Sequence, residues 1–329
     1  MTTYQQLFIK ACENGEFNSV KQLYQDHSDE IDIHSRNEFT FRCSCEYGHL
    51  EIAKWLIQIS KEEGQPIDIH VNDECAFRLS CRNGHFEIAK WLIQLGKEEG
   101  QPINIHADDE CPFQFSCRNG YLEIAKWLIQ LGKDEGHPID IHADNEYAFR
   151  WSCEGGHFEI VKWLIQLGKG EGHPIDIHAD NEDAFKMSCM SGRLEIAKWL
   201  IQLGKEEVQP INIHTDDEYA FRWSCANGHF EIVKLLIQLG KGEGHPIDIH
   251  ADNEYAFRFS CGNGHFEIAK WLVRMSNVIP ENYIIHYITQ YRPYQQNHMK
   301  QYYKDVFHNK FNERKLETVW NHCSRVDII

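Results

Sequence analysis

The chain has 329 residues and carries 33 lysine and arginine residues against 50 aspartate and glutamate residues, a formal net charge of −17. This acidic balance argues against nucleic-acid binding through phosphates, which needs clustered basic side chains. No stretch reaches the roughly 18 apolar residues of a membrane span, and the N-terminus lacks the basic and apolar regions of a secretory signal. We therefore expect a soluble, cytoplasmic protein that binds neither nucleic acid nor membrane.

The first predicted element is a degenerate cap repeat at about residues 4–30. The run from Leu7 to Phe17 follows, in outline, the frame that the rest of the chain repeats. A terminal repeat must face water on one side, and its outward residues are expected to be polar. These residues are Gln5, Gln6, Lys10 and Lys21.

Seven near-copies of one segment then follow at a fixed step of 36 residues. Their opening histidines are His34, His70, His106, His142, His178, His214 and His250. A constant period of this size predicts a solenoid, in which each unit buries its apolar face against its neighbours.

Each copy predicts two helices and a link. In one copy, apolar residues recur at steps of three and four from Phe158 to Ile165, the period of a helix with one buried stripe. Before it, Phe149, Trp151 and Cys153 predict a shorter apolar helix that stops at a left-handed Gly156. After it, residues 175–178 alternate with period two, as an extended link would.

The segment from Gly84 to Ile93, with its six sister copies, resembles the turn and second helix of the ankyrin repeat. The first helix and the step depart from that family, whose step is about 33 residues. In the Lys-Trp-Leu-Ile-Gln-Leu-Gly-Lys run the chain resembles the ankyrin-repeat proteins of giant DNA viruses of the Mimivirus type. The resemblance implies an all-α helix-turn-helix solenoid of about eight repeats with short extended links. We assign the array to residues 1–277 and a helical C-terminal segment to residues 278–329.

Cysteines and tryptophans recur at fixed positions of the copies. Eight cysteines form one ladder: Cys12, Cys45, Cys81, Cys117, Cys153, Cys189, Cys225 and Cys261. Neighbours one repeat apart are about 10 Å distant, too far for a disulfide, so we interpret them as small buried packing residues. Six tryptophans on the second helix predict a packing ladder: Trp55, Trp91, Trp127, Trp163, Trp199 and Trp271.

Histidines and charged residues also recur. In the resembled family the histidine after the turn glycine, as in His85, helps to close the inter-helix turn. The opening histidines either titrate together or, as we favour, make structural hydrogen bonds. Glu38 lies four residues before Arg42, and most copies repeat this spacing, which predicts a helical ion-pair ladder or a carboxylate ladder for ligands. We expect no cofactor and no metal site.

Positions that differ between the copies are the candidate partner-binding residues, because repeated residues build the stack. In the resembled family they lie toward the concave surface and hairpin edge, where partners dock. They are Tyr47, Arg82, Asn83, Arg118, Asn119, Tyr147, Glu154, Asp183, Met190, Tyr219, Asn227, Tyr255 and Asn263. Drift at tolerant exposed sites is the alternative reading.

The composition changes at residue 278, where aromatic residues become frequent. Pro280 suits a first helical turn, and the segment is predicted either to cap the last repeat or to dock a partner. A faint resemblance to the F-box-like tails of some viral ankyrin proteins makes an adaptor for ubiquitin ligation one alternative. A thiol hydrolase using Cys75, Cys111 or Cys323 is another.

We predict a non-enzymatic, monomeric scaffold that binds a partner protein along the concave and hairpin surface. If the chain is viral, the host cytoplasm is the expected location.

Overall fold

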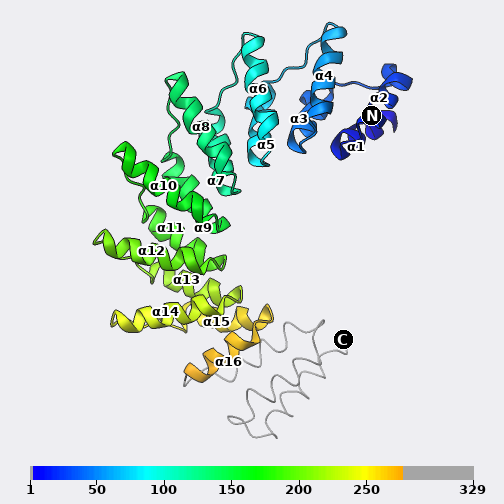
Figure 1. Ribbon diagram of the computed structural model, residues 1–329. Coiled ribbons are helices and arrows are strands. Elements are labelled where there is room, and N and C mark those ends of the chain that lie inside the picture. Colours follow the sequence, from blue (N-terminus) through cyan, green and yellow to red (C-terminus); the bar gives the residue numbers. More distant parts are fainter. Residues whose placement is uncertain (1–2, 277–329) are drawn as a thin grey trace, which may run out of the picture. The chain divides into compact units, whose positions relative to one another are not determined.

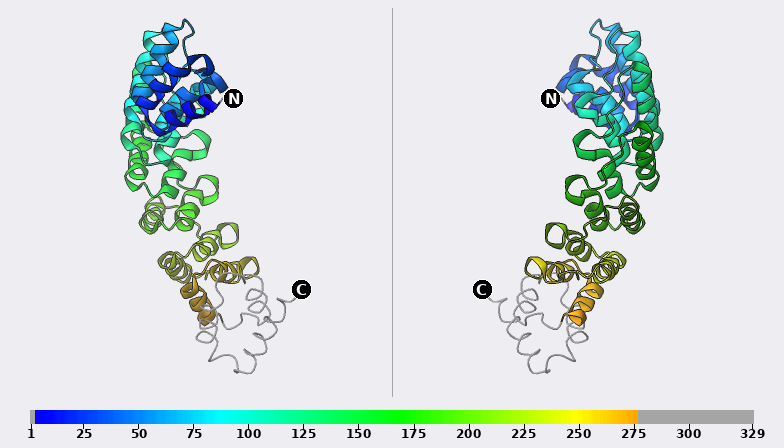
Figure 2. Two further views of the ribbon diagram at one scale, coloured as in Figure 1. Left: turned by 90° about the vertical axis from the view of Figure 1, so that its right-hand side faces the viewer. Right: turned by 90° about the vertical axis from the view of Figure 1, so that its left-hand side faces the viewer.

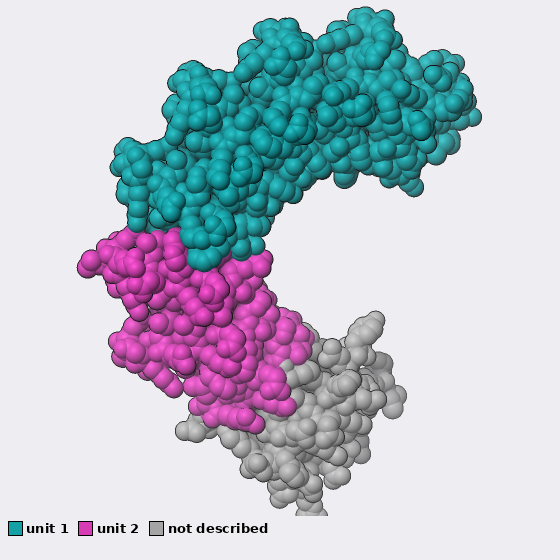
Figure 3. All heavy atoms as spheres, in the orientation of Figure 1, with its two compact units in different colours: residues 1–179 teal, residues 180–329 magenta. Residues whose placement is uncertain are grey.

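The structure is a computed structural model, and it describes residues 3–276. Within these residues it contains helices and no strand, which confirms the all-α class. The chain divides into two compact units, residues 1–179 and 180–329, coloured separately in Figure 3. The C-terminal segment from residue 278, with the helix expected after Pro280, lies outside the described residues.

The helices come in pairs, each a first helix and a second helix (Figure 1). The first helices are α1 (Thr3–Asn14), α3 (Ser35–Glu46), α5 (Val71–Arg82), α7 (Ala107–Arg118), α9 (Ala143–Gly155), α11 (Ala179–Met190), α13 (Thr215–Ala226) and α15 (Ala251–Gly262). The second helices are α2 (Phe17–His27), α4 (Leu50–Glu62), α6 (Phe86–Glu98), α8 (Leu122–Glu135), α10 (Phe158–Glu171), α12 (Leu194–Glu206), α14 (Phe230–Gly242) and α16 (Phe266–Met275). A short 3-10 turn, η1 (Ser28–Glu30), follows α2.

We call the pair α1–α2 the cap repeat and number the later pairs repeats 1 to 7. Unit 1 holds the cap repeat and repeats 1 to 4, and unit 2 holds repeats 5 to 7. Within unit 1 the pairs stack side by side (Figure 2), with the first helices on the inner side of an arc and the second helices on the outer side (Figure 1). In repeat 4, Gly156 caps α9 in the left-handed conformation with φ 84°, as the sequence predicted.

The core is a ladder of phenylalanines and cysteines shared between neighbouring first helices. Phe149 and Cys153 are both 0 % exposed, and their sister residues are buried as well. The second helix adds its apolar stripe, and most links add two buried isoleucines, such as Ile175 and Ile177. The tryptophans lie at the edge of this core: Trp163 is half-buried and meets the buried Phe113 of the preceding repeat edge-on, with ring centroids 6.3 Å apart. The tryptophan ladder therefore joins repeats, as predicted.

Each of the seven repeats enters its first helix through three consecutive left-handed residues. In repeat 4 these are Asp144, Asn145 and Glu146, with φ of 53°, 53° and 64°. Asparagine and aspartate tolerate this region better than other side chains, which explains why they occupy most of the first two positions. The regular helix begins only after the glutamate, at Tyr147 in repeat 4.

Within the described residues, the expected ion pair between the glutamate and the arginine four residues later does not form, so that prediction is wrong. Side chains four residues apart meet only when the backbone between them is helical, and the glutamate is left-handed. Arg150 instead turns back to the left-handed turn, where its Nε donates to the Asn145 carbonyl at 2.7 Å and its Nη2 to the Asp144 carbonyl at 3.0 Å. The arginine therefore satisfies the carbonyls of the left-handed turn.

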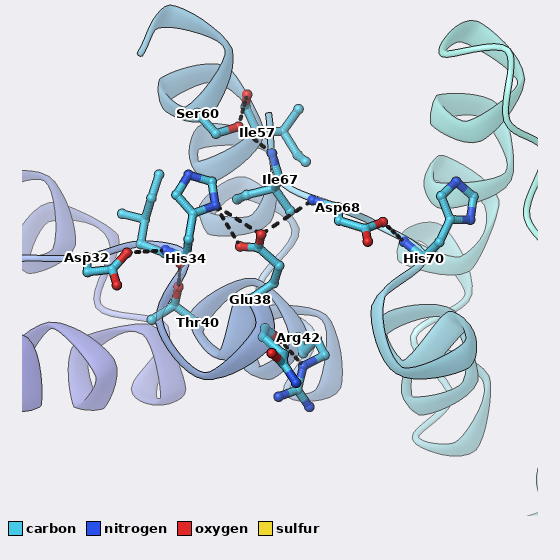
Figure 4. Close-up of polar contacts among 12 residues, drawn as sticks. Asp32, His34, Glu38, Thr40, Arg42, Ile57, Ser60, Ile67, Asp68 and His70 are labelled. Atoms are coloured by element: carbon cyan, nitrogen blue, oxygen red, sulfur yellow. Dashed lines mark hydrogen bonds and ion pairs between the residues drawn. The ribbon is translucent and has the colours of Figure 1, made fainter. Parts of the chain in front are cut away.

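The glutamate links one repeat to the next. The Nδ1 of His142 lies 2.8 Å from Oε1 of Glu146, and the same oxygen accepts the backbone N–H of Asp176, in the next link, at 3.0 Å. Figure 4 shows the equivalent contacts of Glu38 with His34 and with the backbone N–H of Asp68. The glutamates are buried despite their charge, with exposures of 6–8 %. We call this arrangement the glutamate staple.

The cap repeat makes the same link with a different residue. Gln5 was expected to face water, but it is 4 % exposed. Its Oε1 accepts the backbone N–H of Asp32 at 2.6 Å, and its Nε2 donates to the Asp32 carbonyl at 3.1 Å. An amide can replace the carboxylate here because it supplies both a donor and an acceptor to one backbone residue.

A residue just after the second helix of repeat 5 differs from its counterparts in the other repeats. Val208 has φ 62° and an exposure of 89 %, whereas glycine with positive φ occupies the equivalent position in repeats 1 to 4 and in repeat 6, where it is Gly244. A β-branched side chain is strained in this conformation, and no burial compensates the strain.

We predict that Glu110→Gln lowers the free energy of unfolding by about 2 kcal/mol, because Glu110 accepts charge-assisted bonds from His106 and from the Asp140 backbone. Urea denaturation measures the change. Glu123→Gln is the matched control, since that exposed side chain pairs with Lys126 at 3.5 Å on the surface and should change stability by less than about 0.5 kcal/mol. Equal effects of the two substitutions would contradict the staple.

We also predict that Val208→Gly raises the free energy of unfolding by about 1 kcal/mol by releasing the left-handed strain. The reciprocal change at the sister position, Gly244→Val, should lower it by a similar amount. Thermal and urea unfolding of the three proteins give both values. A destabilised Val208→Gly variant would show that the valine makes a favourable contact.

Candidate partner-binding surface

Three positions of each first helix, spaced i, i+4 and i+7, lie along one side of that helix. We call these three columns together the first-helix stripe. The first column is Phe39, Cys75, Cys111, Tyr147, Asp183, Tyr219 and Tyr255. The second is Cys43, Leu79, Phe115, Trp151, Met187, Trp223 and Phe259. The third is Glu46, Arg82, Arg118, Glu154, Met190, Ala226 and Gly262. All but three of these residues reach solvent; Cys43, Cys111 and Ala226 are buried.

In unit 1 the stripe carries an arginine–aromatic patch, formed by Arg82, Phe115, Arg118, Tyr147 and Trp151. The Arg118 guanidinium lies 3.9 Å from the centroid of the Trp151 ring, and its Nη1 donates to the Tyr147 hydroxyl at 3.0 Å. The Arg82 guanidinium lies 5.2 Å from the Phe115 centroid. These contacts cross three successive repeats, so the patch is continuous over α5, α7 and α9.

In unit 2 the stripe carries an aromatic patch, formed by Tyr219, Trp223, Tyr255 and Phe259. Successive ring centroids are 5.8, 5.5 and 4.1 Å apart. The Tyr219 hydroxyl donates to the sulfur of Met190 at 3.5 Å. Burial raises the pKa of Tyr255 above its usual value. Half-buried aromatic rings of this kind are typical of the residues that dominate protein interfaces.

Sequence reasoning missed the second column. It grouped Trp151 with Phe149 and Cys153, but residues two apart on a helix point to different sides. Phe149 and Cys153 are fully buried, whereas Trp151 is half-exposed. Trp151 lies four residues after the variable Tyr147, and the residue at its position changes from copy to copy. These two features could have placed it on the same side of the helix as Tyr147.

The four asparagines among the candidate residues make bonds between repeats. Asn83, Asn119, Asn227 and Asn263 each donate from Nδ2 to a backbone carbonyl of the preceding repeat, at 2.8–2.9 Å. These amides are therefore occupied in the stack. Among the other candidates, Tyr47 is 51 % exposed, and Glu154, Asp183 and Met190 are half-buried.

The side chains of the turn histidines reach the preceding repeat, while their backbone closes the inter-helix turn: the N–H of His85 donates to the Ser80 carbonyl at 2.9 Å. Nε2 of His85 lies 2.9 Å from the carbonyl oxygen of Glu46, and Nε2 of His49 lies 3.0 Å from that of Glu13. Burial lowers the pKa of the equivalent His229. The neutral imidazole therefore dominates there, and one ring nitrogen can still donate to the carbonyl.

The cysteine ladder is buried, as predicted. Burial raises the pKa of Cys12 and Cys261 to about 12 and raises that of Cys225 as well. The two extra cysteines of the first column lie beside arginines: Nη1 of Arg42 is 3.6 Å from Sγ of Cys75, and Nη1 of Arg78 is 3.7 Å from Sγ of Cys111. Burial nevertheless raises the pKa of Cys111. Cys323 lies outside the described residues.

Between residues 3 and 276, no group of three or more histidine, cysteine or acidic side chains is arranged to hold a metal ion. Over the same described range, no helix combines the length and the apolar composition needed to cross a membrane.

We predict that, in the native protein at about pH 8, iodoacetamide modifies Cys75 before any cysteine of the buried ladder. The thiolate is the reactive form, and burial keeps the ladder residues protonated and inaccessible. Peptide mapping by mass spectrometry gives the rate at each site, and the urea-unfolded chain is the control. A ladder cysteine that reacts as fast in the native state as in urea would contradict the buried assignment.

Models of ankyrin repeats match the chain over most of its length. The model of three ankyrin-repeat copies matches residues 7–104, 43–138 and 113–210, and the model of many copies matches residues 184–237. No curated protein matches the chain. The matched segments span more than half of the 329 residues and coincide with the stacked helix pairs. The chain therefore belongs to the ankyrin-repeat family.

Proposed function

We propose that this chain is a non-enzymatic scaffold that binds a partner protein through the first-helix stripe. Ankyrin repeats are generally protein–protein interaction modules, and proteins built from them are typically non-enzymatic. The proposal for this chain goes further, because it assigns the binding to particular side chains.

The proposal rests on a difference between two sets of residues in the repeated unit. The staple glutamate, the ladder cysteine and the core phenylalanine are the same in all seven repeats, and each is buried. The stripe residues change from repeat to repeat and most reach solvent. Repetition is required of residues that build a stack, whereas a selective surface must differ along its length.

The two patches supply the side chains that interfaces favour. Trp151 and Trp223 are half-buried on rigid helices, so little side-chain entropy is lost when a partner covers them. Arg118 is held against Trp151 before any partner arrives. Preorganised aromatic and arginine residues of this kind are enriched at binding hot spots.

The two alternative functions have less support. The residues that suggested a ubiquitin-ligase adaptor lie outside the described part of the chain. For a thiol hydrolase, Cys111 is buried with a raised pKa, which disfavours the thiolate that such an enzyme needs. A viral origin, a cytoplasmic location and a monomeric state remain part of the proposal.

We expect the triple variant Tyr147→Ala, Tyr219→Ala and Tyr255→Ala to bind its partner more weakly by more than about 2 kcal/mol, with unchanged helicity. Affinity purification with mass spectrometry identifies the partner, and calorimetry with the purified partner measures the loss. The control carries Lys90→Ala, Lys162→Ala and Lys234→Ala, three substitutions on the second helices, where each lysine pairs with a glutamate three residues earlier. Unchanged affinity of the tyrosine variant would remove the stripe from consideration.

A further inference from the structure

We infer that the arginine–aromatic patch of unit 1 recognises an acidic segment of the partner, with two carboxylates placed against Arg82 and Arg118. The inference rests on the proposed function, because it names the chemistry of what the stripe binds. Four observations on the patch support it.

The first observation is that both arginines lack a carboxylate partner. Within the described residues, no carboxylate oxygen lies within 4.0 Å of the guanidinium of Arg82 or Arg118. The one other arginine of these two helices is paired: Nη1 of Arg78 lies 2.6 Å from Oδ2 of Asp108. In a chain of net charge −17, two unpaired arginines on one surface leave a local positive site for an acidic ligand.

The second observation is that the guanidinium groups are already positioned. Arg118 is stacked on Trp151 and hydrogen-bonded to Tyr147, and Arg82 lies over Phe115. A guanidinium stacked on a ring keeps N–H groups at its edge, where a carboxylate can accept two of them.

The third observation is that hydrogen bonds between repeats hold the backbone at the helix ends near the arginines. The Arg82 carbonyl accepts the side-chain amide of Asn119 at 2.8 Å, and the Glu46 carbonyl accepts that of Asn83 at 2.9 Å. Because these helix ends are already ordered, no free energy is lost in ordering them when a ligand binds, which favours affinity.

The fourth observation is the order of charges along the third column. In unit 1 it runs Glu46, Arg82, Arg118, Glu154, one residue from each successive repeat. Helices pack about 10 Å apart, so the two arginines match carboxylates about three residues apart in an extended peptide. An apolar side chain between those carboxylates would meet Phe115. The flanking glutamates disfavour a ligand that is acidic throughout and favour one with acids only at its centre.

The test is a selection of random dodecapeptides, displayed on phage, against the full-length protein. We expect enriched peptides to carry two acidic residues about three positions apart with an apolar residue between them. Synthetic copies should bind the Arg82→Glu, Arg118→Glu variant about a hundredfold more weakly. The charge-matched control, Lys90→Glu with Lys126→Glu on α6 and α8, should bind within about twofold of the unaltered protein. Circular dichroism checks that both variants are folded.

Peptides in which the two acidic residues are replaced by basic ones provide a second test. Peptides with lysine in place of the two acids should bind the Arg82→Glu, Arg118→Glu variant better than they bind the unaltered protein. Basic or uncharged winners, or acidic winners that bind the double variant equally well, would overturn the inference. Dimerisation of the protein that depends on the two arginines would overturn it too, by making a second copy the occupant.

The outcomes also separate this inference from the proposed function. Uncharged apolar peptides that need Tyr147 and Trp151 but not the arginines would leave the stripe as the binding surface and reject the acidic ligand. Winners that bind equally well to the Tyr147→Ala, Trp151→Ala variant and to the arginine variant would reject both.

Discussion

The glutamate staple is the interaction on which the stack depends. A carboxylate that is about nine-tenths buried needs hydrogen bonds to offset the loss of water. Oε1 of Glu146 contacts a histidine of its own repeat and accepts a backbone N–H of the next, so its charge joins two repeats, while Oε2 has no hydrogen-bond partner within the described residues. The left-handed turn that presents the glutamate is held by Arg150 through two carbonyls. The turn is thus held by bonds within its own repeat and by one bond, from the Asp176 N–H, that forms only when the next repeat is in place.

The staple, the turn histidines and the asparagine amides join the repeats to one another. None of these residues belongs to the first-helix stripe, so the stripe can vary without loss of these bonds. Gly48 illustrates how closely these joints fit: a Cβ placed there would lie 2.7 Å from the His85 ring of the next repeat. The second column varies far more, with cysteine, leucine, phenylalanine, tryptophan and methionine at one position of the repeat. The same sequence period therefore encodes both a fixed stack and a changing surface.

Helix pairs, the left-handed Gly156, the buried cysteine ladder and the inter-repeat role of the tryptophans could all be predicted from periodicity and residue size. The left-handed entry could not, because Glu38 and Arg42 fit a helical spacing equally well. The spacing of His34 and Glu38 is also four, and only the backbone conformation decides between the two pairs. For the candidate surface, variation between copies identified Tyr147. Trp151 was instead grouped with the core, because it stands between Phe149 and Cys153 in the sequence. The hydrogen bonds of Asn83 could not be predicted, since they depend on how closely two turns approach.

The central claim is that residues which vary on the first helices bind the partner, while the outer helices do not. Site-specific photo-crosslinking tests it most directly. A benzophenone amino acid would replace Trp151 or Trp223 on the stripe and, in matched variants, the exposed Gln130 or Gln202 on second helices. The account predicts adducts with one and the same partner protein from the two tryptophan positions and none from the two glutamine positions. Adducts that form only at Gln130 and Gln202 would contradict it.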